Sequence, residues 1–126
     1  MKTPVNTTVL AFIGDAVYEI YARKRVLESG QTNADKLHRM AVKFVKAEGQ
    51  AAAIKSIFDN LSEYEQAIVK RARNKKSASK PKNADPIEYK WATALEALVG
   101  HLYLEGDEER LNEIIELAFA ATDRGV

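Results

Sequence analysis

Apolar residues recur at helical spacing in every long segment of this 126-residue chain, and this periodicity constrains the fold more than any other feature. Segments in which β-branched residues alternate strictly with polar ones are missing. A chain of this length with 46% hydrophobic residues can bury one sizeable core, and it is too short for a second domain. The sequence therefore predicts a single all-α domain over residues 1–126.

Turn and capping residues divide the chain into five predicted helical segments. Gly30 is placed to end the first helix, and Ser62 with Glu65 has the pattern of a capping box at the start of the third. Residues 74–86 contain Ser, Lys, Asn and two of the three prolines, which predicts a loop. The predicted helices span about 5–29, 32–60 with a break near Gly49, 63–73, 87–105 and 107–122.

The composition excludes several classes of protein. The chain has no cysteine, which excludes disulfide scaffolds, thiolate zinc sites and cysteine nucleophiles, and which suits a reducing compartment. The N-terminal apolar run is interrupted by Asp15, and no stretch approaches the roughly 18 apolar residues of a membrane span. We therefore expect a soluble cytoplasmic protein with no membrane segment.

One segment is strongly cationic although the net charge of the chain is only +1. Residues 70–82 carry seven basic residues and no acidic one, and the remaining 12 basic and 18 acidic residues give the rest a net charge of −6. Such a segment predicts contacts to nucleic-acid phosphates without reading of bases, and a solvated loop is the alternative at this point. The candidate RNA-binding residues are Lys70, Arg71, Arg73, Lys75, Lys76, Lys80 and Lys82, in a basic loop of about residues 70–86.

Acidic residues lie at the rims of two predicted apolar helix faces. Asp15 and Glu19 are four residues apart beside an apolar arc within residues 9–21, and Glu96 lies beside a second arc within residues 91–102. If the two arcs pack together, the carboxylates converge and favour a cation such as Mg²⁺. Ordinary surface or salt-bridged carboxylates are the alternative. A close helix crossing would explain Gly14 but not the neighbouring Asp15.

Two motifs resemble the catalytic domain of the ribonuclease III family. Residues 10–17 (LAFIGDAV) resemble the signature of that domain, and residues 94–100 (ALEALVG) resemble its second acidic helix. Further segments resemble the short bacterial Mini-ribonuclease III branch, as does the lack of a double-stranded-RNA-binding domain. These segments are residues 37–39, 45–51, 71–74, 81–83 and 92–96.

The resemblance implies a homodimer that hydrolyses phosphodiester bonds in double-stranded RNA and leaves 5′-phosphate ends. In that branch the substrate is a precursor of large-subunit (23S) ribosomal RNA. Asp15 and Glu96 would be the catalytic residues and would hold Mg²⁺, for which Mn²⁺ can substitute, and no organic cofactor is implied. Phe12 would lie at the dimer seam. A catalytically inactive duplex-RNA-binding dimer of the same fold is one alternative, and a helical dimerisation module is another.

The chain departs from the longer ribonuclease III pattern at two positions. Ala11 stands where those enzymes carry a glutamate, and Thr93 stands where they carry an aspartate. Fewer ligands remain, so Glu19 is a candidate third ligand if two metal ions bind. His38 and His101 are expected to be surface or packing residues.

Overall fold

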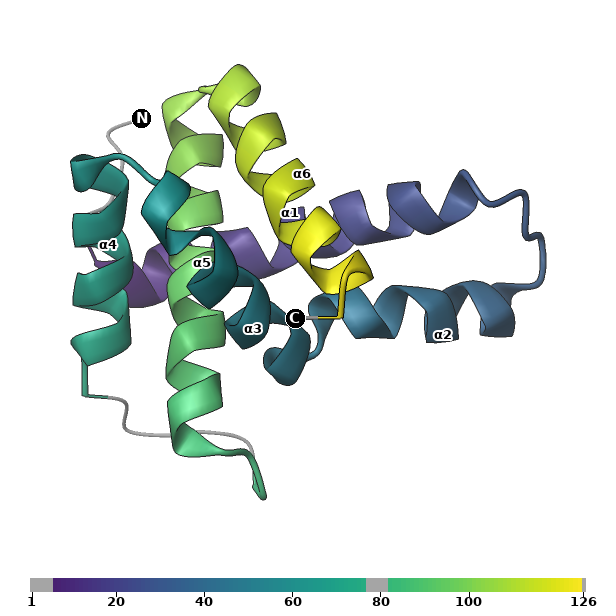
Figure 1. Cartoon of the computed structure of the whole chain (residues 1–126), viewed down its shortest axis with the longest axis horizontal. Helices are drawn as coiled ribbons and strands as arrows, with labels where there is room; N and C mark the ends of the chain where they lie inside the picture. Colours follow the sequence, from purple (N-terminus) through teal and green to yellow (C-terminus); the bar gives the residue numbers. More distant parts are fainter. Residues whose placement is uncertain (1–5, 77–81, 126) are drawn as a thin grey trace.

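The computed structural model describes residues 6–76 and 82–125, which fold into α-helices with no strand among them (Figure 1). The prediction of an all-α fold is confirmed. None of the described helices is both long and apolar enough to cross a membrane. The elements are α1 (Thr7–Leu27), α2 (Ala34–Val45), α3 (Ala47–Ile57), the short 3₁₀ helix η1 (Phe58–Asn60), α4 (Glu63–Asn74), α5 (Pro86–Glu105) and α6 (Glu108–Asp123).

Local capping explains most of the helix boundaries. Just beyond α1, Gly30 adopts a positive φ of 83°, which is the conformation that a glycine allows at a helix end. The predicted capping box of α4 is confirmed, because Ser62 and Glu65 each accept a hydrogen bond from the other's backbone N–H. Asp85 and Asp107 accept backbone hydrogen bonds at the starts of α5 and α6.

The helical segment predicted for residues 32–60, with a break near Gly49, is divided as expected but differs in two details. It begins later than Thr32, since the side chain of Asn33 accepts the capping hydrogen bond from the Lys36 N–H. The chain bends at Lys46, where a ψ of 149° ends α2 and starts α3. Gly49 lies in the first turn of α3, where a Cβ would overlap the carbonyl oxygen of Lys43. The glycine therefore permits the tight bend rather than forming it.

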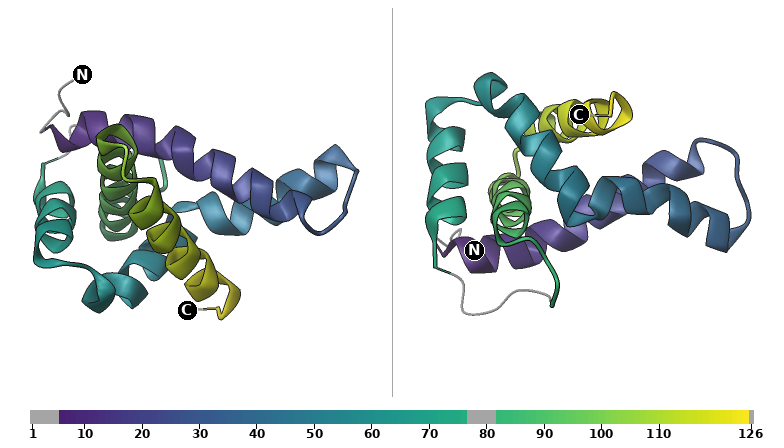
Figure 2. Two further views of the ribbon diagram at one scale, coloured as in Figure 1. Left: turned by 90° about the horizontal axis from the view of Figure 1, so that it is seen from above. Right: turned by 60° about the horizontal axis from the view of Figure 1, so that its bottom comes forward.

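α5 is the central helix of the fold. It packs against α1, α3, α4 and α6, and Figures 1 and 2 show α1 crossing it while the α1–α2 hairpin extends away from the other helices. One hydrophobic cluster joins the helices. Its largest fully buried side chains are Tyr18, Phe119, Leu10, Ile54, Leu95, Leu98, Ile114, Ile115, Val69 and Val99.

The apolar arc expected on α1 is only partly in the core. Leu10 and Val17 are buried, whereas Val9, Phe12 and Ile20 are 44%, 80% and 59% exposed. Apolar residues cover more of the α1 surface than the neighbouring helices can bury. The side of α1 that packs against α5 is the one with Gly14, because this residue has no side chain to keep the helices apart. A row of large apolar side chains therefore remains on the outer face of α1.

Candidate active site

Two glycines bring the backbones of α1 and α5 into direct contact. A Cβ at Gly14 would overlap the carbonyl oxygen of Glu96, and a Cβ at Gly100 would overlap the carbonyl oxygen of Leu10. The close helix crossing considered for Gly14 is thus present. Because Asp15 follows Gly14 directly, the crossing also places Asp15 beside Glu96.

The carboxyl groups of Asp15 and Glu96 converge at this crossing. Asp15 is exposed and Glu96 is partly buried. Burial raises the pKa of Glu96 to about 9, and a hydrogen bond to Asp15 and the Asp15 charge act in the same direction. A bound cation would relieve both the cost of burial and the repulsion between the two carboxylates.

Two further polar side chains surround Glu96, and neither was predicted from the sequence to belong to the site. Gln50 of α3 is 3% exposed, and its Nε2 donates to Oε2 of Glu96 at 3.4 Å. Tyr18 of α1 is fully buried, and its hydroxyl has no hydrogen-bond partner among the described residues. Burial and then the Glu96 charge raise the pKa of Tyr18. The signals for Gln50 in the sequence were its place beside the apolar residues 51–54 and within the segment 45–51 that resembles the Mini-ribonuclease III branch.

Glu19 does not join the carboxylate pair. Its Oε2 accepts from Nε of Arg23 at 3.2 Å, one helical turn along α1. Within residues 6–76 and 82–125, no group of three or more acidic or histidine side chains is placed to hold a metal ion. The candidate metal ligands are therefore two carboxylates. This number fits Mg²⁺, because that ion keeps several waters and takes one or two protein carboxylates.

The positions that lack the longer family's acids have ordinary structural roles. Ala11 is buried in the core, and Thr93 Oγ1 donates to the carbonyl oxygen of Tyr89 at 2.8 Å within α5. His101 is buried with its ring 5.4 Å from that of Tyr64, and His38 is exposed on α2. The expectation of packing and surface roles for both histidines agrees with these positions.

The basic segment starts within a helix, as the helix predicted over residues 63–73 implies. Lys70, Arg71 and Arg73 lie in α4, which continues to Asn74, so the loop begins later than residue 70. Arg73 stacks on Trp91 at 4.8 Å. Lys70 lies over the ring of Phe58 at 5.7 Å, and Lys75 donates to Oδ1 of Asn6 at 2.8 Å. Lys76 and Lys82 are exposed, and Lys80 lies outside the described residues.

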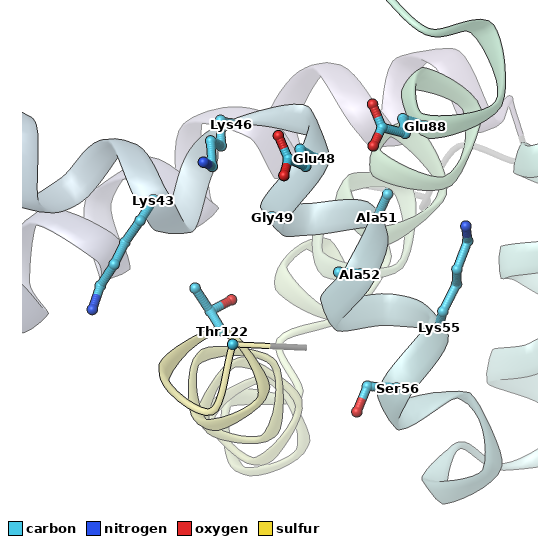
Figure 3. A pocket seen from close by; sticks show the side chains of 11 residues that line it. Lys43, Lys46, Glu48, Gly49, Ala51, Ala52, Lys55, Ser56, Glu88 and Thr122 are labelled. Atoms are coloured by element: carbon cyan, nitrogen blue, oxygen red, sulfur yellow. The ribbon is translucent and has the colours of Figure 1, made fainter.

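A separate groove of about 790 Å³ lies between α3 and the C-terminal end of α6 (Figure 3). Lys43, Lys46 and Lys55 line it together with Glu48 and Glu88. Residues 48, 52 and 55 of α3 are on the opposite side of that helix from residue 50. The groove therefore does not contain the carboxylate pair.

Comparison with known proteins agrees with this fold. The model of the Ribonuclease III domain family matches residues 8–107. A Symbiobacterium thermophilum protein named Mini-ribonuclease 3 is 47% identical over 92% of this chain and 89% of its own length. A Thermoanaerobacter protein of the same name is 49% identical over 90% of this chain and 80% of its own.

A solved structure has the same arrangement of helices. The crystal structure of a Fusobacterium nucleatum protein matches with a TM-score of 0.79 and 38% identity, over 90% of this chain and 91% of the other. The residues matched by the family model include Asp15 on α1 and Glu96 on α5. This chain belongs to the ribonuclease III domain family.

Proposed function

We propose that this chain is a metal-dependent endoribonuclease that cuts double-stranded RNA. The single observation that carries the proposal is the Asp15–Glu96 pair, in which two carboxyl groups meet and the pKa of Glu96 rises to about 9. The relatives named Mini-ribonuclease 3 support the same activity.

Asp15 and Glu96 would hold the metal ion, which we propose is Mg²⁺ with Mn²⁺ as a substitute. When bound, such an ion makes water more acidic and stabilises negative charge on a phosphate. The exposed Asp15 carboxylate faces solvent, where an RNA strand can reach it, while the partly buried Glu96 carboxylate anchors the site on the central helix. No side chain needs to act as a covalent nucleophile in this mechanism.

We propose that the basic segment contacts RNA phosphates. Lys70 and Arg73 lie over aromatic rings, which restricts their side chains and lowers the entropy lost on binding. Beyond the end of α4 lie Lys75, Lys76 and Lys82, in the stretch that leads to α5, the helix with Glu96. Duplex RNA suits contacts of this kind, because its deep major groove hides the bases and leaves shape and phosphates to be recognised.

We also propose that a second copy of the chain covers the outer face of α1. Val9, Phe12 and Ile20 form an exposed apolar row on the helix that carries Asp15. A two-fold symmetric dimer with α1 at its interface would place two active sites on one RNA duplex, so that each site cuts one strand. Sedimentation tests this, since a species of only 14.0 kDa at micromolar concentration contradicts a dimer.

The deciding experiment is incubation with a long RNA duplex, with Mg²⁺ or with a chelator. We expect cleavage that needs Mg²⁺ and leaves 5′-phosphate ends. Binding without cleavage at any metal concentration would instead favour the inactive duplex-RNA-binding dimer. A duplex from the ends of precursor 23S ribosomal RNA, compared with an arbitrary duplex, tests whether this RNA is the preferred substrate, as we propose from the family resemblance.

A further inference from the structure

Gln50 has an unusual position for a polar residue. Only 3% of it is exposed, and among the described residues the other buried polar or charged side chains are Thr7, Glu65 and His101. Burial of an amide is costly unless the amide forms hydrogen bonds. The contact that its Nε2 makes is to Oε2 of Glu96.

We propose that Gln50 is a positioning residue that orients the Glu96 carboxylate for a divalent cation. This inference rests on the proposed function and adds a third helix, α3, to the site. Gln50 contacts one of the two oxygens of the Glu96 carboxylate, Oε2. Because Gln50 donates to Oε2, rotation of the Glu96 carboxylate about its last bond is restricted, which leaves Oε1 for the cation.

The chemistry of the amide suits this role better than a charged donor would. A lysine or arginine at position 50 would neutralise the pair and compete with the cation. An amide N–H is neutral, donates to the carboxylate and leaves the negative charge of the pair in place. Carboxylates that ligate metals are commonly held by hydrogen bonds of this kind, and loss of such a partner typically costs about 10–100-fold in metal affinity or activity.

The backbone of α3 holds Gln50 in place. Its N–H donates to the carbonyl oxygen of Lys46 at 3.0 Å in the first turn of α3, directly after the bend. Ala53 and Ile54, on the same side of the helix, are fully buried against the core. Gly49 lets this turn pack against Lys43. The side chain therefore starts from a rigid point and has little freedom to leave Glu96.

The test measures Mn²⁺ binding to the protein alone, by isothermal titration and by electron paramagnetic resonance, without RNA. Gln50→Met keeps the length of the side chain and removes the amide. We expect this variant to bind Mn²⁺ about 10–100-fold more weakly than the wild type, because Glu96 loses its hydrogen-bond donor. We also expect its RNA cleavage to recover substantially at high Mg²⁺, because orientation of the ligand limits metal affinity more than the rate with metal bound.

Gln66→Met is the matched control. Gln66 is a partly buried glutamine whose Nε2, like that of Gln50, donates one hydrogen bond, in this case to the carbonyl oxygen of Phe58 at 2.9 Å in a different part of the fold. We expect this variant to bind Mn²⁺ like the wild type. A loss of Mn²⁺ affinity of similar size in both variants would overturn the proposal, since it would reflect general loosening of the fold.

Other results also decide the question. A folded Gln50→Met protein with wild-type Mn²⁺ affinity overturns the positioning role and leaves the proposed function intact. If both Gln50→Met and Gln50→Leu fail to fold, Gln50 is a core residue and the proposal is wrong. A wild-type protein that binds no Mn²⁺ overturns the proposed function, and this inference fails with it.

Discussion

Glu65 and Glu96 are both shielded from solvent, but their electrostatic surroundings are opposite. Glu65 accepts from Arg110 through both oxygens, with Nε at 2.8 Å and Nη2 at 2.7 Å, and this hydrogen bonding holds the pKa of Glu65 below its usual value. Glu96 faces Asp15 instead, and burial together with that neighbour raises its pKa to about 9. The first pair is satisfied within the chain, whereas the second favours a cation from outside.

A carboxylate that supports the fold thus differs from one that is available to a ligand. Glu65 also completes the capping box at Ser62, and Arg110 reaches the carbonyl oxygen of Asn60, so this pair ties the start of α4 to α6. At Glu96 the donor is the neutral amide of Gln50. Substitutions at the Asp15–Glu96 pair should therefore lower mainly the activity, and substitutions at the Glu65–Arg110 pair should lower mainly the stability.

The largest effect is expected from the carboxylate pair. Asp15→Asn and Glu96→Gln should each lower the rate of duplex RNA cleavage by roughly 10³-fold, because the charge stabilisation supplied by a bound metal ion is several kcal/mol. The folded protein should still bind the duplex. Gel-based cleavage and filter-binding assays measure both properties, and cleavage near the wild-type rate by either variant would remove that residue from the site.

Breaking the Glu65–Arg110 pair should affect stability instead. Arg110→Met leaves a buried carboxylate without its partner and should lower the free energy of unfolding by about 3–5 kcal/mol. Arg23→Met is the control, because its pair with Glu19 is exposed and should contribute less than about 1 kcal/mol. Urea unfolding gives both numbers. Equal losses in the two variants would mean that burial does not distinguish the pairs.

The helix crossing that forms the carboxylate pair can be tested by Gly100→Ala. The added Cβ meets the Leu10 backbone, so the helices must separate at a cost of about 1–3 kcal/mol, and cleavage should fall because Asp15 and Glu96 move apart. Gly106→Asn is the control, since its Cβ would meet no described atom and asparagine tolerates its φ of 74°. Thermal melting and cleavage rates are measured together. Unchanged cleavage in Gly100→Ala would separate the crossing from activity.

The pH dependence of the two carboxylates should have opposite signs. In the folded, metal-free protein the pKa of Glu96 is about 9, above its ordinary value of 4.5. The part of the free energy of unfolding that comes from Glu96 is therefore lost as the pH rises from 4.5 through 9. The lowered pKa of Glu65 makes its contribution disappear as pH falls. Metal binding must displace the Glu96 proton, so Mn²⁺ affinity should rise up to about tenfold per pH unit below that pKa. Calorimetry in two buffers detects the released proton, and Glu96→Gln should abolish that release.

The smallest effect is expected from two lysines at the end of α4. Lys75 donates to the neutral side chain of Asn6, and Lys76 is exposed. Replacing both by alanine should flatten the dependence of log K on log[salt] for duplex RNA, by roughly one unit of slope for each phosphate that is no longer neutralised. Lys24→Ala, on the last turn of α1, is the control. An unchanged slope in the double variant would take these lysines out of the RNA-binding surface.

Helix positions were largely predictable because their signals are local. The Ser62–Glu65 box and Gly30 act within a few residues, so they can be recognised in the sequence directly. The bend at Lys46 was harder, since no residue there has an unusual backbone preference. Which apolar side of α1 is buried also depends on a contact with α5 that is distant in the sequence.

At the candidate site, the amino-acid sequence was enough to identify the family and to predict the two carboxylates, because the motifs around Asp15 and Glu96 are short and ordered along the chain. The folded arrangement was needed to show that they meet, that Glu19 pairs with Arg23 and that Gln50 reaches Glu96. Residue spacing determines the helices and their faces. The meeting of side chains on different helices depends instead on how closely two backbones can approach at Gly14 and Gly100.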